Sequence, residues 1–232
     1  MSAISAPNDA PDDVPEWKRQ TVDRSLQRAR LRAQQRLQGF VDAAIELMTE
    51  QAGTDFTVQE IVERSGMSIR SFYSFFESKE NLLVAVYETV VAAQVVPRLS
   101  ERCAAEADPL NAVRAYVYGL QEMTASRGPA ARALTSFALH LAETHPDSLE
   151  RALRPQIELL TELLEKAAVA GRTNTLLSHG QAARVIHNCV VAAVQAQLLT
   201  PDLGQPISAE ELWTFCANGL CATKIREVSA SA

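Results

Sequence analysis

The sequence predicts an all-α protein of about nine helices. Apolar residues recur at three- and four-residue spacing over most of the 232 residues, and strand-like alternation never lasts for more than a few positions. Pro, Gly and Asp divide this pattern into segments of helical length. The expected helices span residues 17 to about 51, 58–65, 69–75, 79–97, 108–126, 130–144, 149–170, 179–199 and 208–226.

The composition is typical of a soluble globular protein, with 47% hydrophobic and 22% charged residues. The net charge of −6 means that the molecule as a whole does not attract nucleic acid, so any affinity for DNA must come from a local basic patch. The four cysteines show no C-x-x-C spacing and are expected to be reduced and buried; they are Cys103, Cys189, Cys216 and Cys221.

The expected location is the cytoplasm. The first twenty residues lack the basic start and apolar stretch of a signal peptide. The most apolar run, Cys189 to Leu199, is too short for a membrane span, so we expect no membrane partner.

The N-terminal region divides into two parts. Residues 1–17 are rich in Pro, Asp and Ala and are expected to be disordered. Over residues 18–36, called the basic arm below, seven cations face one acid, a local charge of +6; the cations are Lys18, Arg19, Arg24, Arg28, Arg30, Arg32 and Arg36. The arm can follow phosphates or reach a minor groove, with Arg28 and Arg32 as candidate contacts. The alternative is a solvated helix face.

The second half of the first helix carries a one-sided apolar stripe, and Gly53 is expected to end the helix. The stripe consists of Leu37, Phe40, Val41, Ala44, Ile45 and Met48.

Residues 54–83 carry the clearest functional signal. Thr57 and Glu60 form a capping box at the start of a helix, and Gly66 follows where a tight turn needs a residue without a β-carbon. Ser68 and Ser78 are placed to cap the next two helices. Three caps and one turn glycine in this order indicate a helix-turn-helix. An ordinary helical hairpin is the alternative.

The second helix of this motif, residues 69–75, is too short to be stable alone. Phe72 and Phe76 are expected to face inward, where Phe56 and Met67 complete a small core. The outward face carries short polar groups and one arginine, which suit close approach to a DNA groove. These residues are Arg70, Ser71 and Ser74, with Tyr73 at the edge.

Residues 40–86 resemble the DNA-binding segment of the tetracycline-repressor family. The family signature Y-x-x-F-x-x-K-e-x-L-L stands here as Tyr73, Phe76, Lys79, Glu80, Leu82 and Leu83. The resemblance implies phosphate contacts by Thr57, Ser68, Tyr73 and Lys79, and base reading by Arg70 and Ser71. The departures are Val62 and Ser65 for alanines, Met67 for valine, and Phe75 for a histidine, where we expect packing instead.

The resemblance also implies a DNA-binding domain over residues 18–80 and an effector-binding and dimerisation domain over 81–232. The helix 179–199 is apolar nearly all round, so one side can face its own core and the other a two-fold partner. In the family the last two helices form such an interface; a monomer in which both are core helices is the alternative. The candidate interface residues are Ile186, Val190, Ala193, Gln197, Phe215 and Gly219.

A ligand pocket is expected among the helices of the C-terminal domain, because apolar walls there carry a few polar groups. The ligand is expected to be a small apolar or amphipathic molecule, and no cofactor is expected. The candidate pocket residues are Tyr116, Leu120, Met123, Phe137, His140, Leu141 and His187.

No enzyme is expected, because the sequence carries no catalytic or phosphate-binding motif and its histidines show no metal-ligand spacing. The expected function is that of a dimeric repressor that a ligand releases from DNA, with the helix 79–97 as the lever between the domains. Ligand-promoted DNA binding stays open. Three other classes also stay open: a redox or metal sensor using Cys216 and Cys221, an enzyme on a helical bundle, and a helical adaptor.

Overall fold

The computed structural model describes residues 15–125, 128–199 and 205–221, and the regular structure in these ranges is entirely helical. Because α4, η1 and α5 follow one another without a break, these elements form nine helices, which confirms the predicted fold class. The elements are α1 (Glu16–Gln51), α2 (Val58–Ser65), α3 (Ile69–Phe75), α4 (Lys79–Val90), η1 (Val91–Val95), α5 (Val96–Ala104), α6 (Pro109–Ala125), α7 (Gly128–Thr144), α8 (Pro146–Val169), α9 (His179–Leu199) and α10 (Ala209–Leu220).

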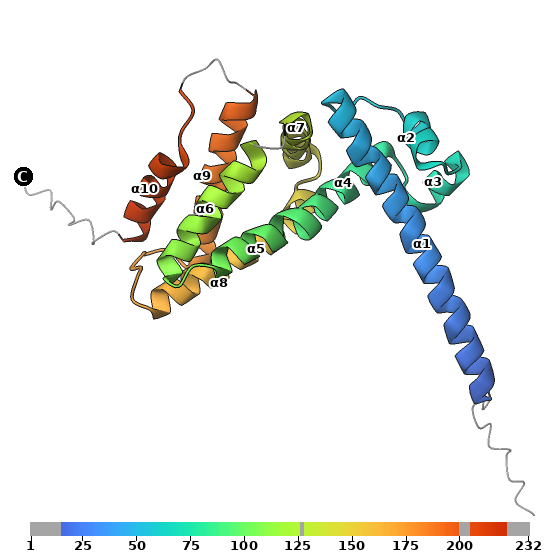
Figure 1. The fold of residues 1–232 in the computed structure, drawn as a ribbon, viewed down its shortest axis with the longest axis horizontal. Helices are drawn as coiled ribbons and strands as arrows, with labels where there is room; N and C mark the ends of the chain where they lie inside the picture. The colour runs from blue at the N-terminus through green and yellow to red at the C-terminus, as the bar shows by residue number, and fades with distance from the viewer. Residues whose placement is uncertain (1–14, 126–127, 200–204, 222–232) are drawn as a thin grey trace, which may run out of the picture.

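The N-terminal unit consists of α1, α2, α3 and the start of α4 (Figure 1). The second half of α1 buries most of the predicted apolar stripe against α2 and α4, although Leu37 stays 37% exposed. The helix ends at Gln51 as predicted, but Ala52 takes the left-handed conformation there, with φ of 55°. Gly53 therefore does not supply the left-handed residue that we expected of it.

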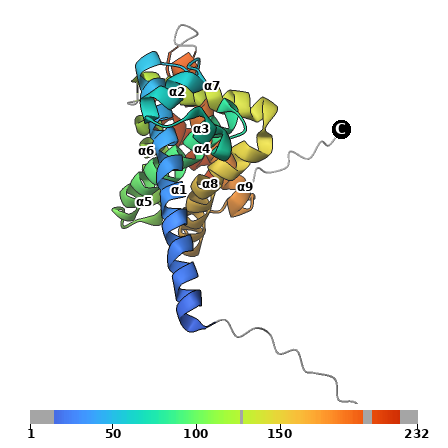
Figure 2. The same cartoon turned by 90° about the vertical axis from the view of Figure 1, so that its right-hand side faces the viewer.

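The first half of α1 projects away from the rest of the molecule in both views (Figures 1 and 2). Every residue from Glu16 to Arg32 is exposed. The predicted disordered segment 1–17 lies largely outside the described residues, and the helix includes its last two positions, Glu16 and Trp17. The basic arm is thus a solvent-exposed helix that continues directly into the N-terminal unit.

The C-terminal body contains α5 to α10, with α6, α8 and α9 in mutual contact and α10 packed on α6 and α9 (Figure 1). Each helix contributes one apolar side to a common core, as amphipathic helices require. The largest fully buried side chains of this core are Leu99, Tyr116, Leu141, Leu160, Leu164 and His187.

The helix that joins the two units is longer than the sequence predicted. We expected it to end near Pro97, yet it continues through α5 to Ala104. Pro97 lacks an amide proton and its ring crowds the carbonyl four residues earlier. The chain accommodates this by widening into the π-helical segment η1, where the Val96 amide donates to the Val91 carbonyl five residues back. The proline therefore reshapes the helix without ending it.

Two expectations about the C-terminal region need qualification. Cys103 and Cys216 are buried as predicted, but Cys221 is exposed. The apolar run that we judged too short to span a membrane is part of the 21-residue helix α9, which, like the helix Lys79–Ala104, meets the length and composition of a span. Core helices of soluble proteins pass the same test, and both helices pack against other helices of the body.

The left-handed helix end at Gly66 allows a test of the turn. Gly66 has φ of 67° and open space around it, so Gly66→Ala costs only the strain of a left-handed alanine. We expect the free energy of unfolding to fall by about 1–2 kcal/mol, measured by urea denaturation. The matched control is Ala52→Gly, which removes the same strain at the end of α1. An equal loss in both variants contradicts this account.

Candidate nucleic-acid interface and ligand cavity

The predicted caps of the helix-turn-helix are all present. Thr57 accepts from the Glu60 amide at 3.2 Å while the Glu60 carboxylate accepts from the Thr57 amide at 2.6 Å, and the pKa of Glu60 is lowered because it accepts these hydrogen bonds. Ser68 accepts from the Ser71 amide at 3.1 Å. Ser78 accepts from the Asn81 amide at 3.2 Å. The local chemistry thus determines where α2, α3 and α4 begin.

An aromatic cluster holds α3 against α1. The ring of Phe40 on α1 lies edge-on to Phe72 at 5.5 Å and to Phe76 at 6.3 Å. Phe75 contacts Phe40 at 6.4 Å and is half-buried, as we expected of this departure from the family signature. Phe56 and Met67 pack against the same core. A seven-residue helix without its own stability is positioned by this packing.

The outward face of α3 presents the predicted residues to solvent. Arg70 and Ser74 are exposed, Tyr73 is 56% exposed and Ser71 is half-buried. Ile69, to which the sequence analysis gave no role, is 48% exposed beside them. Its position in the sequence could have indicated a role in DNA binding. An apolar side chain at the start of this helix, directly after the cap residue, can contact the methyl group of a thymine.

Lys79 has a structural role that the sequence did not reveal. Its ammonium group donates to the carbonyl oxygens of Thr54 and Phe56 at 2.8 and 2.9 Å, and lies 5.5 Å from the centre of the Phe56 ring. An ammonium group has three donors, so one is left for a phosphate. Lys79 therefore ties the start of α4 to the loop before α2.

The basic arm carries its arginines in a row. Arg24, Arg28, Arg32 and Arg36 follow at four-residue spacing, which places them along one side of α1. All four are exposed, and within the described ranges the structure shows no ion pair for any of them. The arrangement can line the arginines along a phosphate backbone.

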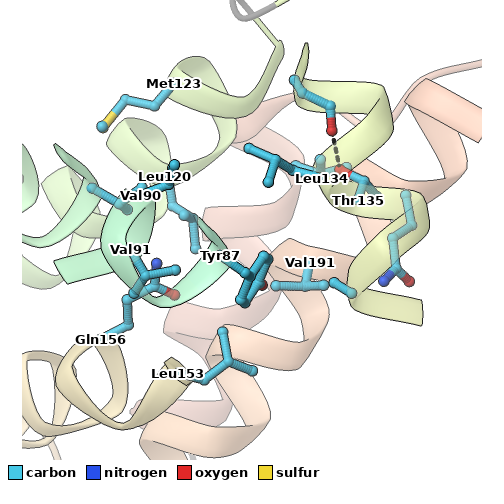
Figure 3. Close-up of a pocket in the computed structure, with 15 residues that line it drawn as sticks. Tyr87, Val90, Val91, Leu120, Met123, Leu134, Thr135, Leu153, Gln156 and Val191 are labelled. Carbon is cyan, nitrogen blue, oxygen red and sulfur yellow. Dashed lines mark hydrogen bonds between the residues drawn. The ribbon is translucent and has the colours of Figure 1, made fainter. Parts of the chain in front are cut away.

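A largely apolar cavity lies between the joining helix, α6, α7, α8 and α9 (Figure 3). Its volume is about 100 Å³. This cavity, called the apolar cavity below, is lined by Tyr87, Val90, Val91, Val95, Leu120, Met123, Ala131, Leu134, Thr135, Ala138, Leu153, Gln156, Val191, Val194 and Gln195.

None of these lining residues is charged. The polar groups are Tyr87, Thr135, Gln156 and Gln195, and the Thr135 hydroxyl already donates to the Ala131 carbonyl at 2.7 Å. Burial raises the pKa of Tyr87 to about 12, so its phenol is neutral at physiological pH. The cavity suits an uncharged group, because desolvating an unpaired charge there is costly.

The structure brings two of the seven candidate pocket residues, Leu120 and Met123, to this cavity. Tyr116, Phe137 and Leu141 are buried outside its wall. The joining helix also contributes to the wall, through residues such as Tyr87 and Val91 that lie within its expected range but were not among the candidates. Their helical spacing alone did not distinguish a cavity wall from a core.

His140 and His187 have other surroundings. His140 is exposed and its Nε2 lies 3.0 Å from the Glu80 carboxylate, with His145 at 3.4 Å from the same oxygen. His187 is 1% exposed, and its Nδ1 lies 3.0 Å from the Tyr116 hydroxyl. His140 therefore links α7 to the start of α4 and is not part of the apolar cavity.

The predicted dimer residues require a correction. Ile186, Val190 and Ala193 are buried in the core of their own chain, so they are not available to a partner. Because this helix is apolar nearly all round, its sequence does not show which side the chain itself covers. Gln197 is exposed, and on α10 so are Gly219 and Phe215, the latter by 69%.

Comparisons with known proteins agree with this geometry. Residues 40–86 match the family model of bacterial regulatory proteins, tetR family. No curated protein sequence matches the chain. Three solved structures share its fold at low sequence identity. These are FadR from Bacillus subtilis in complex with stearoyl-CoA (16% identity, TM-score 0.63, covering 78% of this chain and 98% of that one), reduced E. coli NemR (19%, 0.64, 82% and 100%) and Thermus thermophilus FadR, a repressor in complex with lauroyl-CoA (20%, 0.64, 84% and 99%).

The buried His187 makes the stability of the protein sensitive to acid. Burial lowers the pKa of His187 to about 4, whereas an unfolded histidine titrates near 6.5. The unfolded state therefore takes up a proton first, and the free energy of unfolding contributed by this residue is lost as the pH falls from 6.5 to 4. The loss amounts to about 3 kcal/mol. Urea denaturation across this range should show that the free energy of unfolding depends less steeply on pH in His187→Gln than in the unmodified protein. An equally steep dependence in both proteins would mean that groups other than His187 cause it.

Proposed function

We propose that this chain, whose residues 40–86 match the tetR family of bacterial regulatory proteins, is a repressor that binds palindromic operator DNA as a homodimer and releases it when a small molecule occupies the apolar cavity. One observation carries the proposal. The helix that begins at Lys79, four residues after α3 ends at Phe75, supplies Tyr87, Val90, Val91 and Val95 to the cavity wall. One continuous helix thus connects the candidate DNA-binding motif to the wall of the cavity.

For DNA binding, the proposal assigns base reading to Arg70 and Ser71 and phosphate contacts to Thr57, Ser68, Tyr73, Ser74 and Lys79. A dimer would present two α3 helices about 34–36 Å apart, one turn of B-DNA. The net charge of −6 opposes DNA binding, so the basic arm would provide the compensating local charge through residues such as Arg28 and Arg32.

For dimerisation, the proposal uses the sides of α9 and α10 that the chain itself leaves uncovered. Val185 and Ala192 are exposed on α9, and Phe215 and Gly219 are exposed on α10. A β-carbon placed on Gly219 meets no atom within 4 Å in the monomer, which leaves room for a close helix approach. Exposed apolar groups of this size on two adjacent helices favour a self-complementary interface.

For ligand response, the volume of about 100 Å³ sets a constraint. Sites for drug-sized molecules commonly measure about 300–1,000 Å³, so a ligand must displace part of the wall. We assign this movement to the π-helical segment η1, because Val91 and Val95 of the wall belong to it and π-helical segments are frequent at functional sites. The FadR structures of the same fold hold acyl-CoA molecules, in which an apolar chain is joined to a polar group, and this supports an amphipathic ligand.

The movement would reach the DNA-binding unit along two routes. α4 transmits it directly, and α7, which supplies Leu134 and Ala138 to the cavity, packs on α1 and bonds to Glu80 through His140. A coupling of about 1–3 kcal/mol between ligand and operator would change affinity several-fold to a hundred-fold.

The proposal gives the protein no catalytic role and a cytoplasmic location. Cys216 does not favour a redox sensor, because burial raises the pKa of its thiol to about 11 and keeps it protonated. The described residues contain no group of three or more His, Cys, Asp or Glu side chains suited to a metal ion.

Selection of genomic DNA fragments by the full-length protein tests the proposal. We expect a palindromic consensus with half-sites about one turn apart, and release of the selected DNA by a compound library hit that binds the protein. If no fragment is retained even at low salt, the helical adaptor is the better interpretation.

Two variants separate base reading from phosphate binding. Arg70→Ala should relax specificity at one base pair per half-site, with a cost of about 1–3 kcal/mol if the arginine binds guanine with both nitrogens. Tyr73→Ala should weaken binding to operator and scrambled DNA alike, because phosphate contacts carry no sequence information. Binding-site selection and gel-shift titration measure the two effects. An unchanged consensus with Arg70→Ala would remove this residue from base reading.

The basic arm can be tested without truncation. Arg28→Gln with Arg32→Gln removes up to four cations per dimer from the arm, so the slope of log affinity against log salt should fall by up to about 3–4. The control is Arg98→Gln with Arg132→Gln, an equal change of net charge on exposed residues of the C-terminal body. Operator binding at several salt concentrations decides. Equal slopes in both double variants would make the arm a solvated helix face.

The proposed interface predicts that Ala192→Arg yields monomers that no longer bind the palindrome, because a long charged side chain would be buried between two copies of α9. Glu165→Arg on the exposed side of α8 is the control and should leave the dimer intact. Light scattering measures the mass of each variant. A dimeric Ala192→Arg protein would exclude this side of α9 from the interface.

A further inference from the structure

A second cavity lies between the end of α7 and the first halves of α8 and α9. It has a volume of about 490 Å³ and includes His187, Asn188 and four charged groups, Glu150, Arg154, Glu158 and Arg184. We call it the polar cavity. Two acids balance two bases on its rim, and Arg184 pairs with Glu150 at 3.1 Å. The rim therefore has polar character without a strong net charge.

The polar cavity continues the apolar cavity along the same three helices. On α7 the lining passes from Ala138 to Ala142, one turn later, and on α9 from Val191 back to His187. Leu153 on α8 lines both cavities. From Ala131 to Ala142 the helix rise alone gives a length of about 16 Å. The two cavities thus lie next to each other along these helices, and Leu153 is the residue that lines both.

His187 lies where the lining becomes polar, and one of its nitrogens has no partner. The Tyr116 hydroxyl meets Nδ1 at 3.0 Å, while Nε2 is buried without a hydrogen bond among the described residues. Tyr116 is itself fully buried and needs an acceptor for its proton, which Nδ1 supplies. The proton of the neutral imidazole is then on Nε2, so Nε2 is a buried donor without an acceptor.

We propose that the two cavities form one site for an elongated amphiphile, whose apolar chain fills the apolar cavity and whose terminal oxygen group accepts a hydrogen bond from His187 Nε2. This deepens the proposed function and rests on it for the regulatory consequence of binding. The uncharged lining of the apolar cavity excludes a charge at the chain end. The orphaned donor calls for a carbonyl or carboxyl oxygen at the other end, beside Asn188 and Arg154.

The test uses isothermal titration calorimetry with the full-length protein and three probes of equal chain length: decanoic acid, methyl decanoate and decane. We expect the acid, the ester or both to bind more tightly than the alkane. Preference for the acid indicates that Arg154 pairs with a carboxylate, and preference for the ester indicates an uncharged head. Equal affinity for the alkane, or no binding of acid and ester, overturns the proposal and leaves a water-filled polar cavity.

Two variants break the same internal hydrogen bond but differ at the site. His187→Leu removes Nε2 and should weaken the preferred probe by roughly three- to tenfold, the usual net effect of one hydrogen bond. Tyr116→Phe leaves Nε2 in place and should retain affinity within about twofold. Equal losses in the two variants would mean that His187 acts only through the packing of the core. Circular dichroism verifies that both variants are folded.

A third variant tests whether the two cavities are continuous. Leu153→Trp places a large side chain between the two cavities and should abolish binding of the acid and the ester. Unchanged affinity of Leu153→Trp for these probes would show that the two cavities are not one site and would overturn the proposal. These measurements need no DNA, so their outcome does not depend on whether the protein binds an operator. A chain that binds the probe but no operator loses only its assignment as a regulator.

Discussion

The contact of Phe40 with Phe72 and Phe76 is the interaction on which the candidate DNA-binding surface depends. Helix α3 has seven residues, too few to be helical in isolation. Its caps define where it begins, but the three rings determine how it is oriented on α1. Every residue on its outward face takes its direction from this packing. The same α1 contacts α7 of the C-terminal body, so one helix supports α3 and also packs on that body.

The continuous helix α4–η1–α5 relates the two halves of the molecule. Its first turn bonds to the loop before α2 through Lys79, its middle lines the apolar cavity and its last part packs on α6. Pro97 prevents this helix from being uniform, and the π-helical segment lies where the cavity touches it. The irregular hydrogen bonding of η1 therefore lies at the part of the helix that a ligand in the apolar cavity would contact.

The sequence predicted those features that depend on neighbouring residues. The caps at Thr57, Ser68 and Ser78 and the turn at Gly66 were predicted correctly, because each needs only a side chain and a backbone a few residues away. The cavity and the free side of α9 depend on which helices meet, and periodicity does not contain that information. Hence Tyr87 was missed, and Ala193 was selected where its neighbour Ala192 is the exposed residue.

The exposed first half of α1 also affects the thermodynamics of DNA recognition. A helix without tertiary contacts is only marginally stable, so its turns open and its amide protons exchange far faster than those near Phe40. Holding it against a phosphate backbone would restrict this fraying. Part of the gain from released counterions would then be offset by lost conformational entropy, and the binding enthalpy would become strongly temperature-dependent. On DNA, such an arm would lose some affinity and gain adaptability, because a helix that frays can follow operators of different curvature.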